Sequence, residues 1–72
     1  MNYHYSLMIQ WSAEDQLYLV TLPEFSDIAM QPCTYGRTYE EAVANAQEAI
    51  AGYLEYCQEE GILPPSPVPT AA

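Results

Sequence analysis

The N-terminal part of the chain alternates between large apolar residues and mostly polar ones. From Tyr3 to Trp11 the odd positions are apolar or aromatic, and the even positions are His4, Ser6, Met8 and Gln10. A period of two is typical of a strand with one buried face. A polar turn over residues 12–16 follows. The apolar run from Leu17 to Leu22 then predicts a second strand, buried on both faces, that forms a hairpin with the first.

The next apolar segment is interrupted by prolines. Pro23 ends the second strand because proline has no N–H for the ladder. Ile28 to Tyr35 is a candidate third strand, and Pro32 within it indicates either an edge position or a bulge.

Residues 38–60 carry the signals of one long helix. Thr38 and Glu41 have the spacing of a capping box, in which the Thr38 hydroxyl accepts the Glu41 N–H and the Glu41 carboxylate accepts the Thr38 N–H. Gly61 is placed as a left-handed terminator, and Pro64 prevents continuation. At 100° per residue the helix has an apolar stripe that is expected to cover a sheet face. The stripe consists of Tyr39, Val43, Ala46, Ile50, Tyr53, Leu54 and Cys57.

These elements predict an α+β fold of order β-β-β-α, a three-stranded antiparallel sheet packed by one long helix. We assign residues 1–63 to one domain and residues 64–72 to an extended Pro-rich tail. One helix covers only one face of a sheet. On the other face, Met8 with either Tyr18 and Val20 or Leu17 and Leu19 leaves apolar surface, for which self-association is the natural remedy.

The charge of the chain restricts its partners. Its 72 residues include ten carboxylates and one cation, Arg37, for a net charge of −9. Binding of a nucleic-acid backbone relies on Lys and Arg, so we expect no direct contact with nucleic acid, and attraction to basic proteins instead. The alternative is that acidity only keeps a small protein soluble. On the helix, Glu41, Glu48, Glu55 and Glu59 lie opposite the apolar stripe, either as a solvated face or as a surface for a basic partner.

Few residues offer catalytic chemistry. His4 is the only histidine, and no carboxylate falls within the predicted strands, where a metal-dependent nuclease would gather them. His4, Cys33 and Cys57 lack the spacing of metal ligands, so we expect neither a metal nor a cofactor. No apolar run approaches the ~20 residues that span a membrane. Two cysteines without a signal peptide predict reduced thiols in a cytoplasmic protein. The lone His4 and the absence of carboxylates from the predicted strands lead us to expect that the protein is not an enzyme.

Three segments taken together resemble the HicB family of antitoxins. They are Leu-Pro-Glu-Phe at 22–25, Tyr-Gly-Arg-Thr-x-Glu-Glu-Ala at 35–42 and Asn-Ala-Gln-Glu-Ala-Ile at 45–50, and Gly-Ile-Leu-Pro-Pro-Ser-Pro also fits the helix exit of that family. The resemblance covers residues 3–67. It implies a partial RNase H-like fold without catalytic carboxylates, often closed by a short fourth strand. It also implies a partner, a small basic HicA toxin, which is a ribonuclease whose active site the antitoxin masks. The chain ends at Ala72 without the DNA-binding domain that many members carry, so autorepression is not expected.

The candidate partner-binding residues lie in two turns. Glu24, Phe25 and Asp27 form the loop after the second strand, and Glu14 and Asp15 lie in the turn before it. Phe25 flanked by carboxylates is suited to anchor on a basic active site, although it could equally plug the end of the sheet. The expected function is that of an antitoxin. The alternative is a solitary homo-oligomer, a dimer or tetramer, with no cognate toxin.

Overall fold

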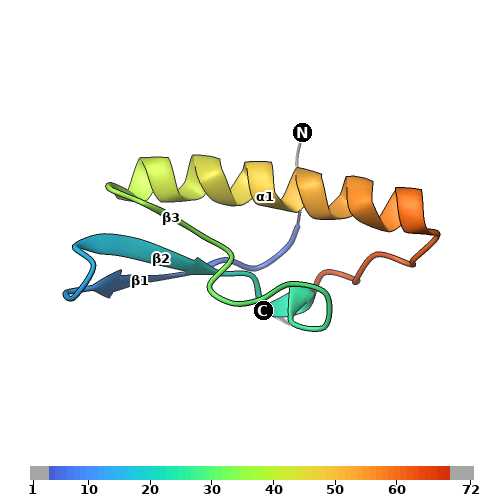
Figure 1. Cartoon of the computed structure of the whole chain (residues 1–72), viewed down its shortest axis with the longest axis horizontal. Coiled ribbons are helices and arrows are strands. Elements are labelled where there is room, and N and C mark those ends of the chain that lie inside the picture. Colours follow the sequence, from blue (N-terminus) through green and yellow to red (C-terminus); the bar gives the residue numbers. More distant parts are fainter. Residues whose placement is uncertain (1–3, 69–72) are drawn as a thin grey trace.

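An antiparallel three-stranded sheet followed by one long helix makes up the fold, in a computed structural model that describes residues 4–68 (Figure 1). The strands are β1 (Met8–Ser12), β2 (Leu17–Thr21) and β3 (Thr34–Gly36), and the helix is α1 (Tyr39–Glu60). A 3-10 helix, η1 (Pro23–Phe25), lies between β2 and β3. The order in the sheet is β1-β2-β3. The α+β class and the β-β-β-α order predicted from the sequence are therefore confirmed.

β1 and β2 form the predicted hairpin. Met8 lies opposite Thr21 and Ser12 lies opposite Leu17, with regular antiparallel register between them. β1 begins at Met8 and not near Tyr3, which lies outside the described residues. The prediction was too long because β2 ends at Thr21, and η1 then leads the chain away, so residues 4–7 have no strand to pair with.

β3 is an edge strand, but it is much shorter than the predicted segment from Ile28 to Tyr35. The N–H groups of Ile28 and Ala29 both donate to the Phe25 carbonyl, at 3.1 and 2.9 Å, which turns this part of the segment away from an extended course. The Gln31 side chain then takes the place of a pairing strand. Its Oε1 accepts the Leu22 N–H at 3.1 Å and its Nε2 donates to the Leu22 carbonyl at 2.9 Å.

Local signals set both ends of α1. The Thr38 hydroxyl accepts the Glu41 N–H at 3.0 Å, as predicted. The Glu41 carboxylate accepts the N–H of Arg37 at 3.0 Å, one residue earlier than the capping box predicts. At the other end Gly61 is left-handed, with φ 67°, and the Ile62 N–H donates to the Cys57 carbonyl at 2.8 Å. This is a Schellman ending, which satisfies carbonyls that the helix itself leaves unpaired.

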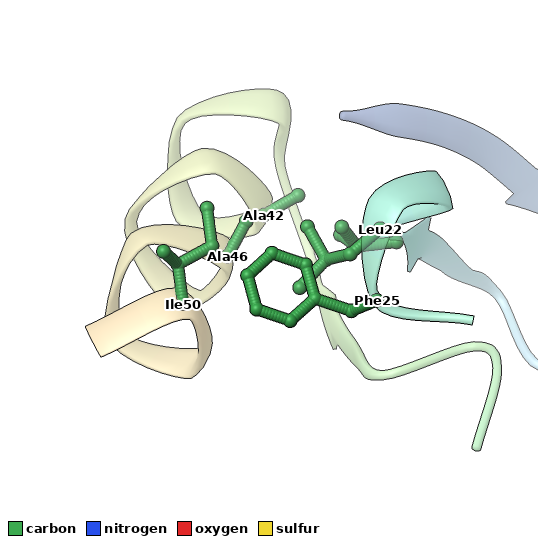
Figure 2. Close-up of a cluster of buried hydrophobic side chains, with 6 residues drawn as sticks. Leu22, Phe25, Ala42, Ala46 and Ile50 are labelled. Atoms are coloured by element: carbon green, nitrogen blue, oxygen red, sulfur yellow. The ribbon is translucent and has the colours of Figure 1, made fainter. Parts of the chain in front are cut away.

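The core lies between α1 and the face of the sheet that it covers. Phe25 projects toward α1 with Leu22 beside it, so that η1 closes the core at the end of β2 (Figure 2). Tyr39, predicted for the apolar stripe, is mostly exposed, although its ring stacks on Tyr18 at 4.4 Å between centroids. The fully buried cluster is made of Val20, Leu22, Phe25, Ala42, Ala46 and Ile50.

The opposite face of the sheet has no helix over it (Figure 1). Because paired residues point to the same side, the register places Val20 on the α1 side and Leu17 and Leu19 on the other. The prediction that β2 is buried on both faces is therefore wrong. We call the uncovered side the open face. Its residues are Met8, Gln10, Ser12, Leu17, Leu19, Thr21 and Tyr35.

Candidate protein-binding surfaces

Charged side chains lie almost entirely at the surface. Of the ten carboxylates, nine are exposed and Glu24 alone is half-buried. Arg37, the single cation, is also exposed and directly precedes the N-cap of α1. A surface of this kind repels phosphates and attracts basic groups.

The turn between β1 and β2 presents Glu14 and Asp15 to solvent. Gln16 closes the turn in the left-handed region, with φ 56°, and its N–H donates to the Ser12 carbonyl at 2.8 Å. The Ser12 hydroxyl donates to Asp15 Oδ2 at 3.1 Å and accepts the Asp15 N–H at 3.2 Å. Asp15 is thus held in place, and both carboxylates remain available to a partner.

Glu24 joins three parts of the chain. Ser6 donates its N–H to Oε1 at 3.0 Å and its hydroxyl to Oε2 at 3.0 Å, and the Val68 N–H donates to Oε2 at 3.1 Å. Burial raises the pKa of Glu24, but these hydrogen bonds outweigh it, so the pKa lies below its ordinary value of 4.5. The carboxylate therefore fastens the N-terminal segment and the tail to η1, a role that the sequence did not indicate.

Phe25 is the predicted anchor, and it has no exposed surface. Its ring meets Tyr5 edge-on at 4.7 Å between centroids and lies 5.6 Å from the Tyr53 ring. The expectation of an exposed aromatic anchor is therefore wrong, and Phe25 takes the alternative role of plugging the end of the sheet. The reason is that η1 turns the side chain inward onto α1 (Figure 2).

Asp27 lies on the surface beside a small hollow between the η1 loop and the tail. The hollow is about 260 Å³ and is lined by Glu24, Asp27, Ile28, Ile62, Leu63 and Pro65. Leu63 is 90% exposed, so this end of the molecule offers an aliphatic contact next to a carboxylate. Sequence reasoning missed Leu63. A large apolar residue just beyond a helix terminator was the signal that could have found it.

The five predicted residues do not form one site. Glu14 and Asp15 precede β2, whereas Glu24, Phe25 and Asp27 follow it, so the two groups lie at opposite ends of that strand (Figure 1). At ~3.4 Å per residue, a five-residue strand separates them by about 17 Å. A single partner that touched both groups would have to span the length of the sheet.

The outer side of α1 carries an acidic surface. Glu41, Glu48, Glu55 and Glu59, which we call the acidic face of α1, are all exposed. Glu41 also accepts the Arg37 N–H, while Glu55 and Glu59 lie toward the negative end of the helix dipole. Their positions there are unfavourable for the isolated helix and favour contact with cations.

Another hollow lies between β3 and α1. It is about 470 Å³ and is lined by Cys33, Thr34, Tyr35, Asn45, Glu48 and Ala49. The Cys33 thiol donates to Gln31 Oε1 at 2.9 Å. Burial raises the pKa of Tyr53, and its hydrogen bond with Cys33 adds to the effect. The Cys33 thiol thus contacts both the Gln31 amide and the Tyr53 hydroxyl.

Among residues 4–68, no three His, Cys, Asp or Glu side chains lie close enough together to hold a metal ion. His4 is exposed, and Cys33 and Cys57 are both free thiols.

Comparison with known proteins identifies no relative of this chain. No family model, no curated protein and no solved structure matches this chain. Within residues 4–68, no helix is both long enough and apolar enough to cross a membrane.

Proposed function

We propose that the chain is a non-enzymatic, HicB-like antitoxin that binds a small basic HicA-type ribonuclease and keeps RNA from its active site. The resemblance of residues 3–67 to that family supports the proposal, and the β-β-β-α order is compatible with a partial RNase H-like unit. The two free thiols fit a reducing cytoplasm, where we place the protein.

The observation that carries the proposal is the exposure of nine carboxylates against a single exposed cation. Such a surface competes with RNA for a basic groove because it presents the same sign of charge as a phosphate backbone. Long-range attraction speeds association, and contacts at the interface then set the rate of dissociation.

For the interface we propose Asp27 together with Leu63, and the Glu14–Asp15 turn as a second, separate contact. Leu63 replaces Phe25 as the apolar element because it is exposed and Phe25 is buried. Glu24 stays in its internal role, since its carboxylate already accepts hydrogen bonds from Ser6 and Val68.

The test uses any small basic HicA-type protein whose reading frame lies next to that of this chain, purified separately. We expect the wild-type chain to bind it and to stop its cleavage of RNA at equimolar ratio. Asp27→Lys should raise the dissociation constant by about tenfold, mainly through a faster dissociation rate. Kinetic binding measurements and an RNA cleavage assay report both effects.

Glu59→Lys is the matched control, because it makes the same change of charge on the acidic face of α1. We expect it to slow association slightly and to leave dissociation unchanged. Equal effects of the two variants on dissociation would move the interface to α1. Full RNA cleavage in the presence of excess wild-type chain would refute the antitoxin proposal.

The second candidate is a solitary homo-oligomer without a toxin, and the open face favours it. Met8 and Tyr35 on that face are 44% and 57% exposed, beside the half-buried Leu17 and Leu19. Apolar side chains gathered on one uncovered sheet face mark an association surface. An oligomer that neither binds nor inhibits the HicA-type protein would support this candidate over the first.

A further inference from the structure

β1 is an edge strand without the features that normally protect an edge. It is Met-Ile-Gln-Trp-Ser, with no charged residue and no proline, and its pairing with β2 is regular over all five positions. Native sheets usually guard an edge with Lys, Pro, a bulge or a covering segment. The other edge is guarded, because Asn45 of α1 donates from Nδ2 to the Tyr35 carbonyl of β3 at 2.7 Å.

The register also shows which backbone groups of β1 point outward. The Val20 carbonyl accepts the Cys33 N–H at 2.8 Å, so the backbone groups of Val20 point toward the β3 side. Groups alternate along a strand, and those of Leu19 therefore point toward β1, opposite Gln10. By the same alternation the N–H and C=O groups of Ile9 and Trp11 point away from the sheet.

The described chain does not supply a strand for this edge. α1 packs mainly against β3 and β2, and β1 is the strand of the sheet that lies farthest from it (Figure 1). The tail returns toward the N-terminal segment, where the Tyr5 hydroxyl donates to the Pro65 carbonyl at 2.8 Å. Pro64, Pro65 and Pro67 have no N–H for a ladder, and the Val68 N–H is used by Glu24.

The charge of the chain favours a second copy over a basic partner at the β1 edge. A basic partner is drawn to the exposed carboxylates, none of which lies on β1. A second copy, also at −9, can approach only where both surfaces are neutral. Antiparallel pairing of two β1 strands places the Glu14–Asp15 turns at opposite ends, about 17 Å apart for five residues. That exceeds the screening length of ~8 Å at physiological salt.

Pairing of two β1 strands would also bury apolar side-chain surface on both faces of the sheet. Trp11 stacks edge-on against Tyr18 at 5.0 Å between centroids and remains 51% exposed at the margin of the sheet. Met8, on the open face, is 44% exposed. Two-fold pairing covers part of each and extends the open face across both copies.

From these observations we infer that β1 pairs antiparallel with β1 of a second copy, with Ile9 opposite Trp11 of the partner, to form one six-stranded sheet in a dimer. The inference does not rest on the proposed toxin, since its test uses this chain alone.

The test combines sedimentation with hydrogen exchange on the full chain. We expect a mass of twice 8.1 kDa at tens of micromolar. The Ile9 and Trp11 amides should gain protection from exchange as concentration rises, because only the dimer gives them acceptors. Emission of Trp11, the only tryptophan, should shift to shorter wavelength over the same range. Added salt should tighten the dimer by screening the two negative charges.

Gln10→Lys is the variant that tests the β1–β1 contact. In the proposed pairing the side chain at position 10 faces the same side chain of the other copy across the two-fold axis. Like-charge repulsion between the two lysines should therefore raise the dissociation constant of the dimer by about tenfold or more. Gln58→Lys, on exposed α1, makes the same change of net charge and should leave the constant within about twofold, since it lies away from β1. Circular dichroism checks that both variants fold.

Three outcomes overturn the inference. They are a monomer over the whole concentration range, a dimer in which the Ile9 and Trp11 amides exchange as in the monomer, and equal weakening by both lysine variants. The exchange measurement needs no variant, so the inference remains testable even if Gln10→Lys does not fold.

Discussion

Adding one methyl group at Gly36 tests how closely β3 approaches α1. Gly36 is buried, and a Cβ on it would clash with the Ala42 nitrogen and lie 2.7 Å from Ala42 Cα and 2.8 Å from the Glu41 carbonyl carbon. Ordinary contacts between carbon atoms are ~3.5–4.0 Å, so the overlap is about 1 Å. The atoms belong to the backbone of the first helical turn and cannot rotate away. The two elements would therefore have to move apart.

The cost follows from this geometry. Overpacking in a closed site costs ~1–3 kcal/mol, and the rigid backbone places Gly36→Ala near ~3 kcal/mol. A chain of this length has a total free energy of unfolding of roughly 4–11 kcal/mol. The melting temperature should fall by about 12–24 °C. Urea unfolding and thermal melting followed by far-ultraviolet circular dichroism measure both quantities.

Gly52→Ala is the matched control in the same protein. Nothing lies within 4 Å of a Cβ at Gly52, which is exposed within α1. Alanine there should raise the free energy of unfolding by ~0.5–1 kcal/mol, because glycine is a poor helix residue. A Gly36→Ala protein as stable as the wild type would refute the close approach of β3 to α1.

Two further changes probe the N-terminal end of α1 and the η1 junction. Thr38→Ala should lower the free energy of unfolding by ~1 kcal/mol because the Glu41 N–H loses its acceptor, while Thr38→Ser should retain most of it, as thermal melting can show. Glu24→Gln should cost about 1 kcal/mol at neutral pH, the low end for hydrogen bonds to a partly exposed charged group. Because the pKa of Glu24 is lowered when folded, its contribution is present above pH 4.5 and is lost as the pH falls through the folded value. The difference between wild type and Glu24→Gln in urea unfolding should therefore shrink on acidification below that pH, and a constant difference would contradict the role of the carboxylate.

Features governed by neighbours in sequence were predictable. Thr38, Gly61 and the stripe between them set the helix, because caps and helical hydrogen bonds join residues only a few positions apart. The hairpin followed in the same way from alternation and a short polar turn.

The candidate site was less predictable because its geometry depends on distant partners. Ser6 and Glu24 are 18 positions apart, and Val68 and Glu24 are 44 apart, so no local pattern indicates that this carboxylate is already engaged. Phe25 next to two carboxylates suggests a surface loop, and only the turn of η1 directs its ring into the core. Asp27 and Leu63 line the same hollow only because the segment after α1 folds back beside η1.

By itself, then, the sequence determined the order of elements, the length of the helix and the net charge of −9, which together restrict the partners. The tertiary structure decided which face of β2 is covered, since both faces are apolar and only the register with β3 and the position of α1 distinguish Val20 from Leu19. It also decided that Gly36 must be glycine for lack of space, without any positive φ. Such choices depend on contacts between segments that lie far apart along the chain, and these contacts exist only once the elements have packed together.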